Sequence, residues 1–184
     1  MENMRGKVLW ITRTAVMLAM LIGLQALTKP LGQLVTGSCV NAVLAVTGLL
    51  CGMSSGLTIA LLSPGFAYLL GIAPQIVTVP AIMAGNACYV LLLGLLADQR
   101  NAWSVRSLVA WLVAAAVKFG VLYLLVVKVI CGIAAPRLLA ADMLKPPMLQ
   151  ALPAMFAWPQ LVTALIGGGV AIALVPVLKK AMKG

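Results

Sequence analysis

The sequence predicts an all-α membrane protein: one bundle of about six transmembrane helices with both termini in the cytoplasm. Hydrophobic residues make up 64% of the 184 residues, charged residues make up 9%, and the mean hydropathy is +1.14. A soluble domain carries about 25% charged residues, because its surface must face water. This chain has too little charge for such a surface, so we expect lipid to be its solvent. Residues 1–184 are expected to form a single transmembrane domain.

Charges, prolines and glycines divide the chain into six apolar stretches. Their approximate ranges are 8–28, 34–50, 57–72, 76–97, 107–130 and 158–178. Most are close to the roughly 20 residues that a helix needs to cross a bilayer. The first ends at Lys29 and Pro30, and the fourth ends at Asp98. The third is short and contains Pro64, so we expect a kink or a break there. A link of about 27 residues with four prolines separates the last two stretches.

The distribution of Lys and Arg predicts the orientation in the membrane. With six spans, both termini lie on the same side. That side carries Arg5, Lys7, Arg13, Arg100, Arg106, Lys179, Lys180 and Lys183. The other side carries Lys29, Lys128, Arg137 and Lys145. Because basic residues concentrate in cytoplasmic segments, both termini are predicted to be cytoplasmic and the long link extracellular. No small-residue cleavage site follows the first stretch, so we expect it to be a retained helix.

The composition excludes most catalytic chemistry. The sequence has no His, and its acids, Glu2, Asp98 and Asp142, all lie outside the apolar stretches. It therefore has no carboxylate pair for acid–base catalysis. Gly167–Gly169 has no Lys nearby and is not a phosphate-binding loop, so the chain cannot hydrolyse ATP. The four Cys show no close pairing that predicts a metal site or a disulfide. We predict no enzyme activity, cofactor, metal or nucleic-acid partner.

Polar side chains near the predicted outer side are candidate ligand contacts. Five of the six Gln fall on this side. A buried amide without a partner is costly, so such residues bond a neighbouring helix, water or a ligand. One interpretation places them at the lipid headgroups, and the other gathers them in an outward-facing pocket. The candidate pocket residues are Gln33, Tyr68, Gln75, Asn86, Lys118, Tyr123, Trp158 and Gln160.

Lys118 is the most informative of these candidates. It stands near the middle of the fifth stretch, about a dozen residues from either end. A charge at this depth costs roughly 3 kcal/mol, so the side chain should face protein or a wet cavity. No acid inside any stretch can pair with it. Its partner is either a carboxylate or phosphate of a ligand, or the carbonyl groups at the end of a helix.

The sequence also contains two short patterns, a stripe of small residues and a repeated tetrapeptide. Ala15, Ala19 and Gly23 recur every four residues and form a smooth stripe along the first helix. Such a stripe allows another helix to approach closely, either inside this bundle or from a partner protein. The tetrapeptide Gln-Leu-Val-Thr opens both the second and the sixth stretch, at residues 33–36 and 160–163. Because the flanking residues do not continue the match, we interpret it as at most a weak repeat.

The first helix resembles that of the substrate-binding subunits of energy-coupling-factor (ECF) vitamin transporters. Their signature there is Ala-x-x-x-Ala, which Ala15 and Ala19 match. The chain length, the six spans and the long outer segment before the last helix are also similar. The resemblance implies a subunit of the cell membrane that captures a vitamin from outside. Such a subunit docks through its Ala face, here Ala15, Ala19 and Gly23, on a transmembrane scaffold driven by two cytosolic ATPases.

The residues support the same function without the resemblance. The chain is small for a secondary transporter and has no intramembrane acid for proton coupling. The alternatives are a stand-alone ion-coupled solute carrier and a structural subunit of a membrane complex that binds no ligand. ATP-dependent uptake that requires partner proteins separates the first hypothesis from the carrier. A small molecule bound to the purified protein separates it from the structural subunit. The sequence does not identify the vitamin.

Overall fold

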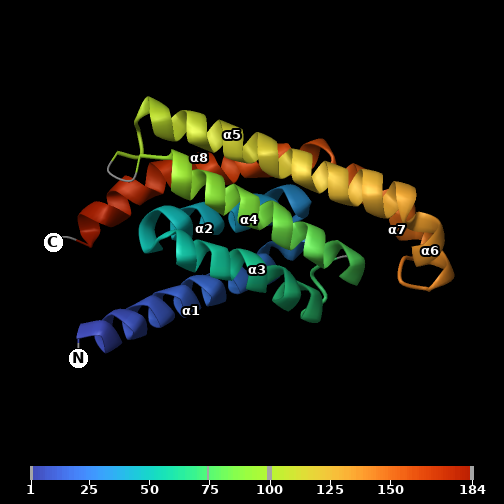
Figure 1. Cartoon of the computed structure of the whole chain (residues 1–184), viewed down its shortest axis with the longest axis horizontal. Helices are drawn as coiled ribbons and strands as arrows, with labels where there is room; N and C mark the ends of the chain where they lie inside the picture. The colour runs from blue at the N-terminus through green and yellow to red at the C-terminus, as the bar shows by residue number, and fades with distance from the viewer. Residues whose placement is uncertain (1, 74, 99–100, 183–184) are drawn as a thin grey trace.

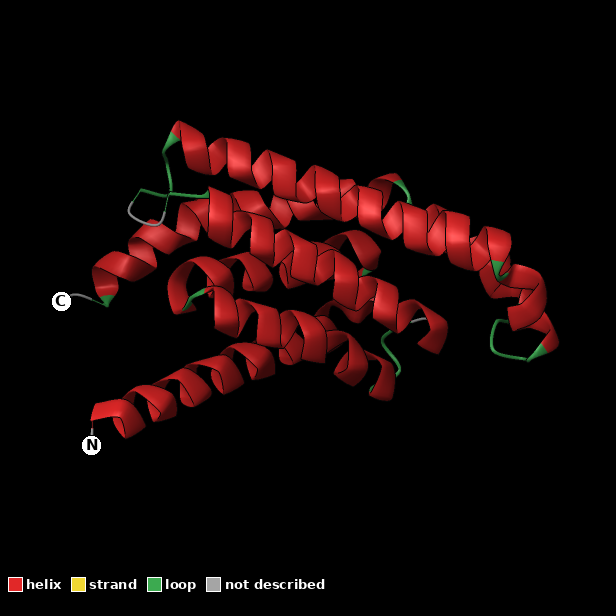
Figure 2. Cartoon of the chain, in the orientation of Figure 1, coloured by secondary structure: helices red, strands yellow, loops and turns green. Residues whose placement is uncertain are grey.

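The computed structural model describes residues 2–73, 75–98 and 101–182, and in these ranges every regular element is helical (Figures 1 and 2). The α-helices are α1 (Glu2–Thr28), α2 (Gln33–Val46), α3 (Met53–Leu69), α4 (Val79–Leu96), α5 (Val105–Leu122), α6 (Ala135–Ala140), α7 (Pro146–Phe156) and α8 (Trp158–Ala181). Four shorter or wider helical segments adjoin them: η1 (Lys29–Leu31), η2 (Thr47–Cys51), η3 (Ile76–Thr78) and η4 (Tyr123–Ile133). The predicted all-α class is confirmed.

The six apolar stretches correspond to six helical elements. Five of the described helical stretches are long and apolar enough to cross a membrane: Met4–Leu31, Gln33–Cys51, Ile76–Leu96, Val105–Ile133 and Trp158–Ala181. The sixth is α3, a shorter apolar helix of 17 residues. Large apolar side chains are exposed all along these elements. This is the pattern expected when the outside of the bundle faces lipid rather than water.

Of the kink or break expected at Pro64, a break is absent. α3 continues through Pro64, which lies inside the helix and is buried. The second and third stretches are separated at Gly52, whose φ of 98° ends η2 and allows α3 to start at Met53. The long link before the last span is also largely helical. The π-helical segment η4 extends α5 to Ile133, and α6 and α7 follow it.

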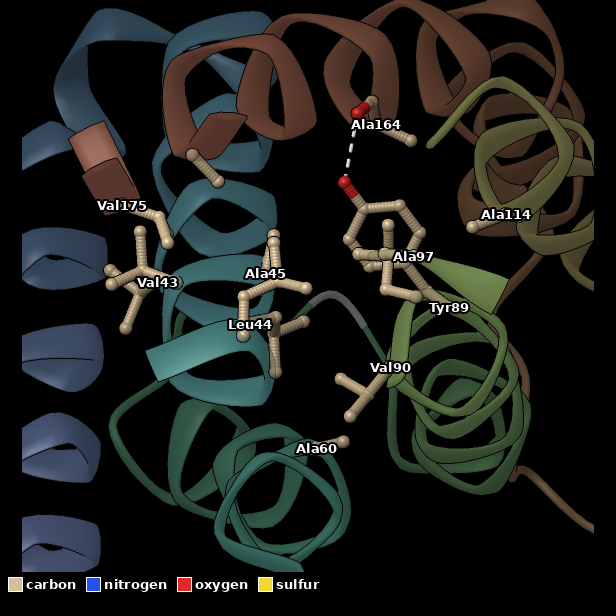
Figure 3. Packing of buried hydrophobic residues seen from close by; sticks show 14 of the residues in the cluster. Val43, Leu44, Ala45, Ala60, Tyr89, Val90, Ala97, Ala114, Ala164 and Val175 are labelled. Carbon is tan, nitrogen blue, oxygen red and sulfur yellow. Dashed lines mark hydrogen bonds between the residues drawn. The ribbon is translucent and has the colours of Figure 1, made fainter. Parts of the chain in front are cut away.

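Close approach between helices explains the three consecutive glycines of α8. A Cβ atom on Gly167 would lie 2.5 Å from the Cβ of Asn41 on α2. A Cβ atom on Gly168 would lie 2.2 Å from Cδ1 of Trp111 on α5. Figure 3 shows Tyr89 of α4 also pointing to α8, where its hydroxyl donates a 3.1 Å hydrogen bond to the carbonyl oxygen of Ala164. These glycines therefore bring α8 against three neighbouring helices.

The bundle has two distinct ends. α1 starts and α8 finishes at the same end (Figure 1). Since α2 and α8 both begin at the other end, the two helices run in parallel. α1 lies at the edge of the bundle against α2 and α3. Only 11% of the 18-residue apolar segment of Met4–Leu31 is buried, compared with 44% for that of Gln33–Cys51. α1 therefore exposes much of its surface outside the bundle.

Candidate ligand-binding cavity

A cavity of about 280 Å³ lies among the helices. It extends from the bundle end where α1 stops and α2 and α8 begin, to Lys118 in the last turns of α5. The polar side chains that line it are Gln25, Lys29, Gln33, Thr36, Asn41, Ser63, Asn86, Lys118 and Gln160. Its volume is close to the lower limit of roughly 300–1,000 Å³ for small-molecule sites. A mostly apolar wall with a few converging polar groups is the usual composition of such a site.

Lys118 forms the inner end of the cavity. The side chain is only 3% exposed and comes from the last turns of α5, near the middle of the continuous helical stretch Val105–Ile133. Its Nζ donates hydrogen bonds of 2.5 Å to Oδ1 of Asn41 and 2.6 Å to Oδ1 of Asn86. The ammonium also lies 5.3 Å from the centre of the Tyr89 ring, within the range of a cation–π contact. The buried ammonium is thus solvated by neutral groups.

Asn41 on α2 and Asn86 on α4 direct these two oxygens to the same Nζ atom. Both side chains are almost completely buried, with exposed fractions of 1% and 2%. Nδ2 of Asn41 donates to Oγ1 of Thr163 on α8 at 3.2 Å. This bond orients the amide so that its oxygen faces Lys118. The inner end of the cavity is therefore a hydrogen-bonded cluster that joins α2, α4, α5 and α8.

The repeated tetrapeptide brings two glutamines together at the outer end of the cavity. Gln33 and Gln160 occupy the first turns of the parallel helices α2 and α8. Their Nε2 atoms both donate to the carbonyl oxygen of Met155 on α7, at 2.6 and 3.2 Å. The two copies of Gln-Leu-Val-Thr thus stand side by side in equivalent positions. The repeat is a local match between two packed helices.

Gln25 of α1 contributes an amide whose oxygen accepts no hydrogen bond from the described residues. The residue is 9% exposed and lines the cavity. Its Oε1 is the buried side-chain oxygen that has no hydrogen-bond partner among the described residues. A buried acceptor without a donor costs about 1–3 kcal/mol. A ligand with a suitably placed N–H or O–H group would remove this cost.

A second cation stands at the outer end of the cavity. Lys29 follows α1, is exposed, and donates a 2.6 Å hydrogen bond to the carbonyl oxygen of Gly71 after α3. This bond joins the ends of two helices beside the cavity. The ammonium group of Lys29 is therefore accessible from the outer end of the cavity.

Four of the eight predicted contact residues line the cavity: Gln33, Asn86, Lys118 and Gln160. The other four do not. Tyr68 is 37% exposed at the end of α3, and Trp158 is 62% exposed. Tyr123 packs beside Phe119, with ring centres 5.9 Å apart, and Gln75 lies in the segment before η3. Tyr68 and Trp158 are therefore exposed, and Gln75 and Tyr123 are half-buried away from the cavity.

Sequence reasoning missed two central residues. Asn41 is not among the predicted contact residues, and Gln25 enters the prediction only as one of the five Gln on the predicted outer side. Asn41 is a polar residue in the middle of an apolar stretch, as Lys118 is, and the same reasoning would have identified it. Gln25 carries no comparable signal, because the number of its hydrogen bonds depends on how α1 is rotated against α2 and α3.

The small-residue stripe lies on the outside of the bundle. Ala15, Ala19 and Gly23 are all exposed. A Cβ atom on Gly23 would have no neighbour within 4 Å. The stripe therefore does not pack inside this bundle, and it remains accessible to a partner helix.

The fold and the cavity define a small polytopic membrane protein that encloses a cavity among its helices. The sequence model of the family described as "ECF transporter, substrate-specific component" matches residues 13–179, which is nearly the whole chain. The chain belongs to this family and is the substrate-capture subunit of an ECF importer. No curated protein and no solved structure matches it significantly.

Proposed function

We propose that the cavity holds the transported substrate, a vitamin or related micronutrient of small size. The observation that carries this proposal is the cavity itself: about 280 Å³ in volume, with the buried Lys118 cluster at one end and amide groups at the other. The cavity brings a buried ammonium without a counter-charge and an unsatisfied amide oxygen into one space, and a ligand that meets both would lower their cost.

The substrate enters from the outside of the cell in this proposal. The cavity extends to the bundle end opposite the chain termini. The terminal end carries most of the basic residues, which favours the cytoplasmic side for that end. The membrane is then the plasma membrane, and the outer end of the cavity faces the medium.

The subunit itself has no means of using ATP, so transport requires partners. These are a transmembrane scaffold subunit and two cytosolic ATPase subunits, as the family implies. α1 supplies the docking surface in this proposal, because it lies at the edge of the bundle and exposes Ala15, Ala19 and Gly23. Small residues on that face permit close approach of a scaffold helix.

Blocking the cavity tests its assignment as the substrate site. Ala67 lines the cavity from α3 and is 3% exposed, so Ala67→Phe should fill the space. Ala116 of α5 is exposed on the outside of the bundle, and Ala116→Phe is the matched control. We expect a small molecule to co-purify with the wild-type chain and with the control, and to be lost from Ala67→Phe. Mass spectrometry of the released molecule measures this. Equal retention by both variants would place the ligand elsewhere.

A further inference from the structure

Charge at the inner end of the cavity points to the chemistry of the substrate. The two charged residues that line the cavity, Lys118 and Lys29, are both cations, and no described Asp or Glu lines it. Lys118 has three N–H donors, of which two are used by Asn41 and Asn86. These amides are neutral, so they solvate the charge without balancing it. An anionic group at hydrogen-bond distance would balance this charge by Coulomb attraction, which is stronger in the protein interior than in water.

The outer end of the cavity combines the exposed Lys29 with a buried hydrogen-bond acceptor. Oε1 of Gln25 is buried and has no donor among the described residues. Gln33 and Gln160 use their Nε2 groups on the carbonyl oxygen of Met155. Each of these two amides keeps a second N–H and an oxygen that can accept, so either group can meet a ligand. The buried oxygen of Gln25 is the group at this end that specifically requires a donor.

The two ends are separated by about two helical turns. Gln33 and Asn41 are eight residues apart on α2, which corresponds to roughly 12 Å at a rise of about 1.5 Å per residue. A single small molecule of elongated shape can reach both ends. The cavity volume of about 280 Å³ leaves little room beyond that.

From these observations we infer that the substrate is an elongated small anion. Its carboxylate or phosphate group pairs with the ammonium of Lys118, and a hydroxyl or N–H group at its other end donates to the amide oxygen of Gln25. This inference rests on the proposed function of the cavity and specifies its substrate class. A cationic substrate would place a second positive charge beside Lys118, and a neutral one would leave the buried ammonium without a counter-charge.

A retention experiment with charge-matched compounds tests the inference. The purified full-length chain is dialysed against a defined mixture of water-soluble vitamins and their precursors. Each anion is accompanied by a neutral analogue: pantothenate with panthenol, biotin with biotinamide, pyridoxal 5′-phosphate with pyridoxal. Thiamine represents the cations. After washing, the retained compounds are quantified by mass spectrometry. We expect one anion that also carries hydroxyl or N–H donors to be retained at least tenfold over its neutral analogue. The pairs distinguish a carboxylate from a phosphate.

Two variants assign the preference to Lys118. In Lys118→Met we expect the ratio of anion to neutral analogue to fall to within about twofold of unity. Lys128→Met is the matched control, because Lys128 lies on the continuation of the same helix but is exposed. The control should keep the wild-type ratio. If Lys118→Met does not fold, the wild-type ratio alone decides.

The outcomes separate this inference from the proposed function. Retention of a neutral compound as strongly as its anion, or preferential retention of thiamine, would overturn the charge assignment and leave the cavity as the substrate site. A preference for anions that persists in folded Lys118→Met would overturn the role of Lys118. Retention of no compound would contradict the proposed function, and the inference with it.

Discussion

At the scale of single residues, the centre of the molecule is an ammonium group held by two amide oxygens and an aromatic ring. Lys118 is 3% exposed, yet the described residues that surround it provide no acid. An arrangement of this kind preorganises a positive site before the ligand arrives, which reduces the cost of ordering side chains on binding. The same neutral partners keep the charge tolerable when the cavity is empty.

Gln25 permits a prediction in which stability and affinity change in opposite directions. Gln25→Met keeps the approximate shape of the side chain but removes its unpartnered buried oxygen. Without ligand, the free energy of unfolding should rise by about 1 kcal/mol, because an unsatisfied acceptor is removed. Affinity for the co-purifying molecule should fall about 3- to 10-fold, which corresponds to one lost hydrogen bond.

Thermal melting of the ligand-free protein and equilibrium binding measure these two quantities for Gln25→Met. Gln150→Met on α7 is the control, because Gln150 is exposed, and neither quantity should change in it. A Gln25→Met variant that melts at a lower temperature and binds normally would show that this amide supports the fold and does not contact the ligand.

The sequence could predict part of the site at this scale. Lys118 and Asn86 are polar residues inside apolar stretches, and their cost in lipid indicates that they face inward. Gln33 and Gln160 open their helices at the outer side and reach the cavity. Tyr68 and Trp158 have the same composition signal but point outward, since an amphipathic aromatic ring is equally stable at the membrane surface. Helix rotation decides between these outcomes, and it is a property of packing.

At the scale of elements, α8 is the helix on which the cavity depends. It contacts α2, α4 and α5 through its glycines and carries Thr163, which orients Asn41. The sequence predicts of these glycines only that they do not form a phosphate-binding loop. Their packing role could not be predicted, because it requires knowing which helices are neighbours.

A pair of glycine substitutions tests the packing of α8. Gly168→Ala should lower the free energy of unfolding by about 1–3 kcal/mol, because the new Cβ would lie 2.2 Å from the Trp111 side chain. Gly120→Ala on α5 is the matched control, since a Cβ atom there would meet nothing within 4 Å. The control should be neutral or more stable by about 0.5–1 kcal/mol. Thermal unfolding in detergent compares them, and equal stability of the two variants would contradict the close approach.

The exposed face of α1 supports a prediction about assembly. Ala15→Trp or Ala19→Trp should prevent close approach of a scaffold helix while leaving the cavity and its ligand intact. Ala116→Trp on α5 is the control, with a similar exposed position on another helix. Co-purification with the scaffold and ATPase subunits, and uptake into cells, should be lost only in the α1 variants. Loss of bound ligand together with assembly would mean that the stripe supports the bundle itself.

At the scale of the whole molecule, composition and the positions of charges, prolines and glycines determine most of the fold. The apolar stretches, ended by Lys29 and Pro30 or by Asp98, correspond to helices within a few residues. At Pro64 the helix is not broken, because a helix surrounded by neighbours tolerates the missing N–H of a proline. The boundary between the second and third stretches falls at Gly52, where a positive φ is available. The order of the helices around the cavity could not be predicted, because apolar faces of similar composition pack in many arrangements.

The structure of the purified chain with its co-purified molecule tests the central claim most directly. The account predicts one small molecule inside the cavity, with an anionic group within about 3.2 Å of Nζ of Lys118 and a donor group at the same distance from Oε1 of Gln25. A small molecule bound at any other surface of the bundle, or a cavity that contains only detergent, would contradict it.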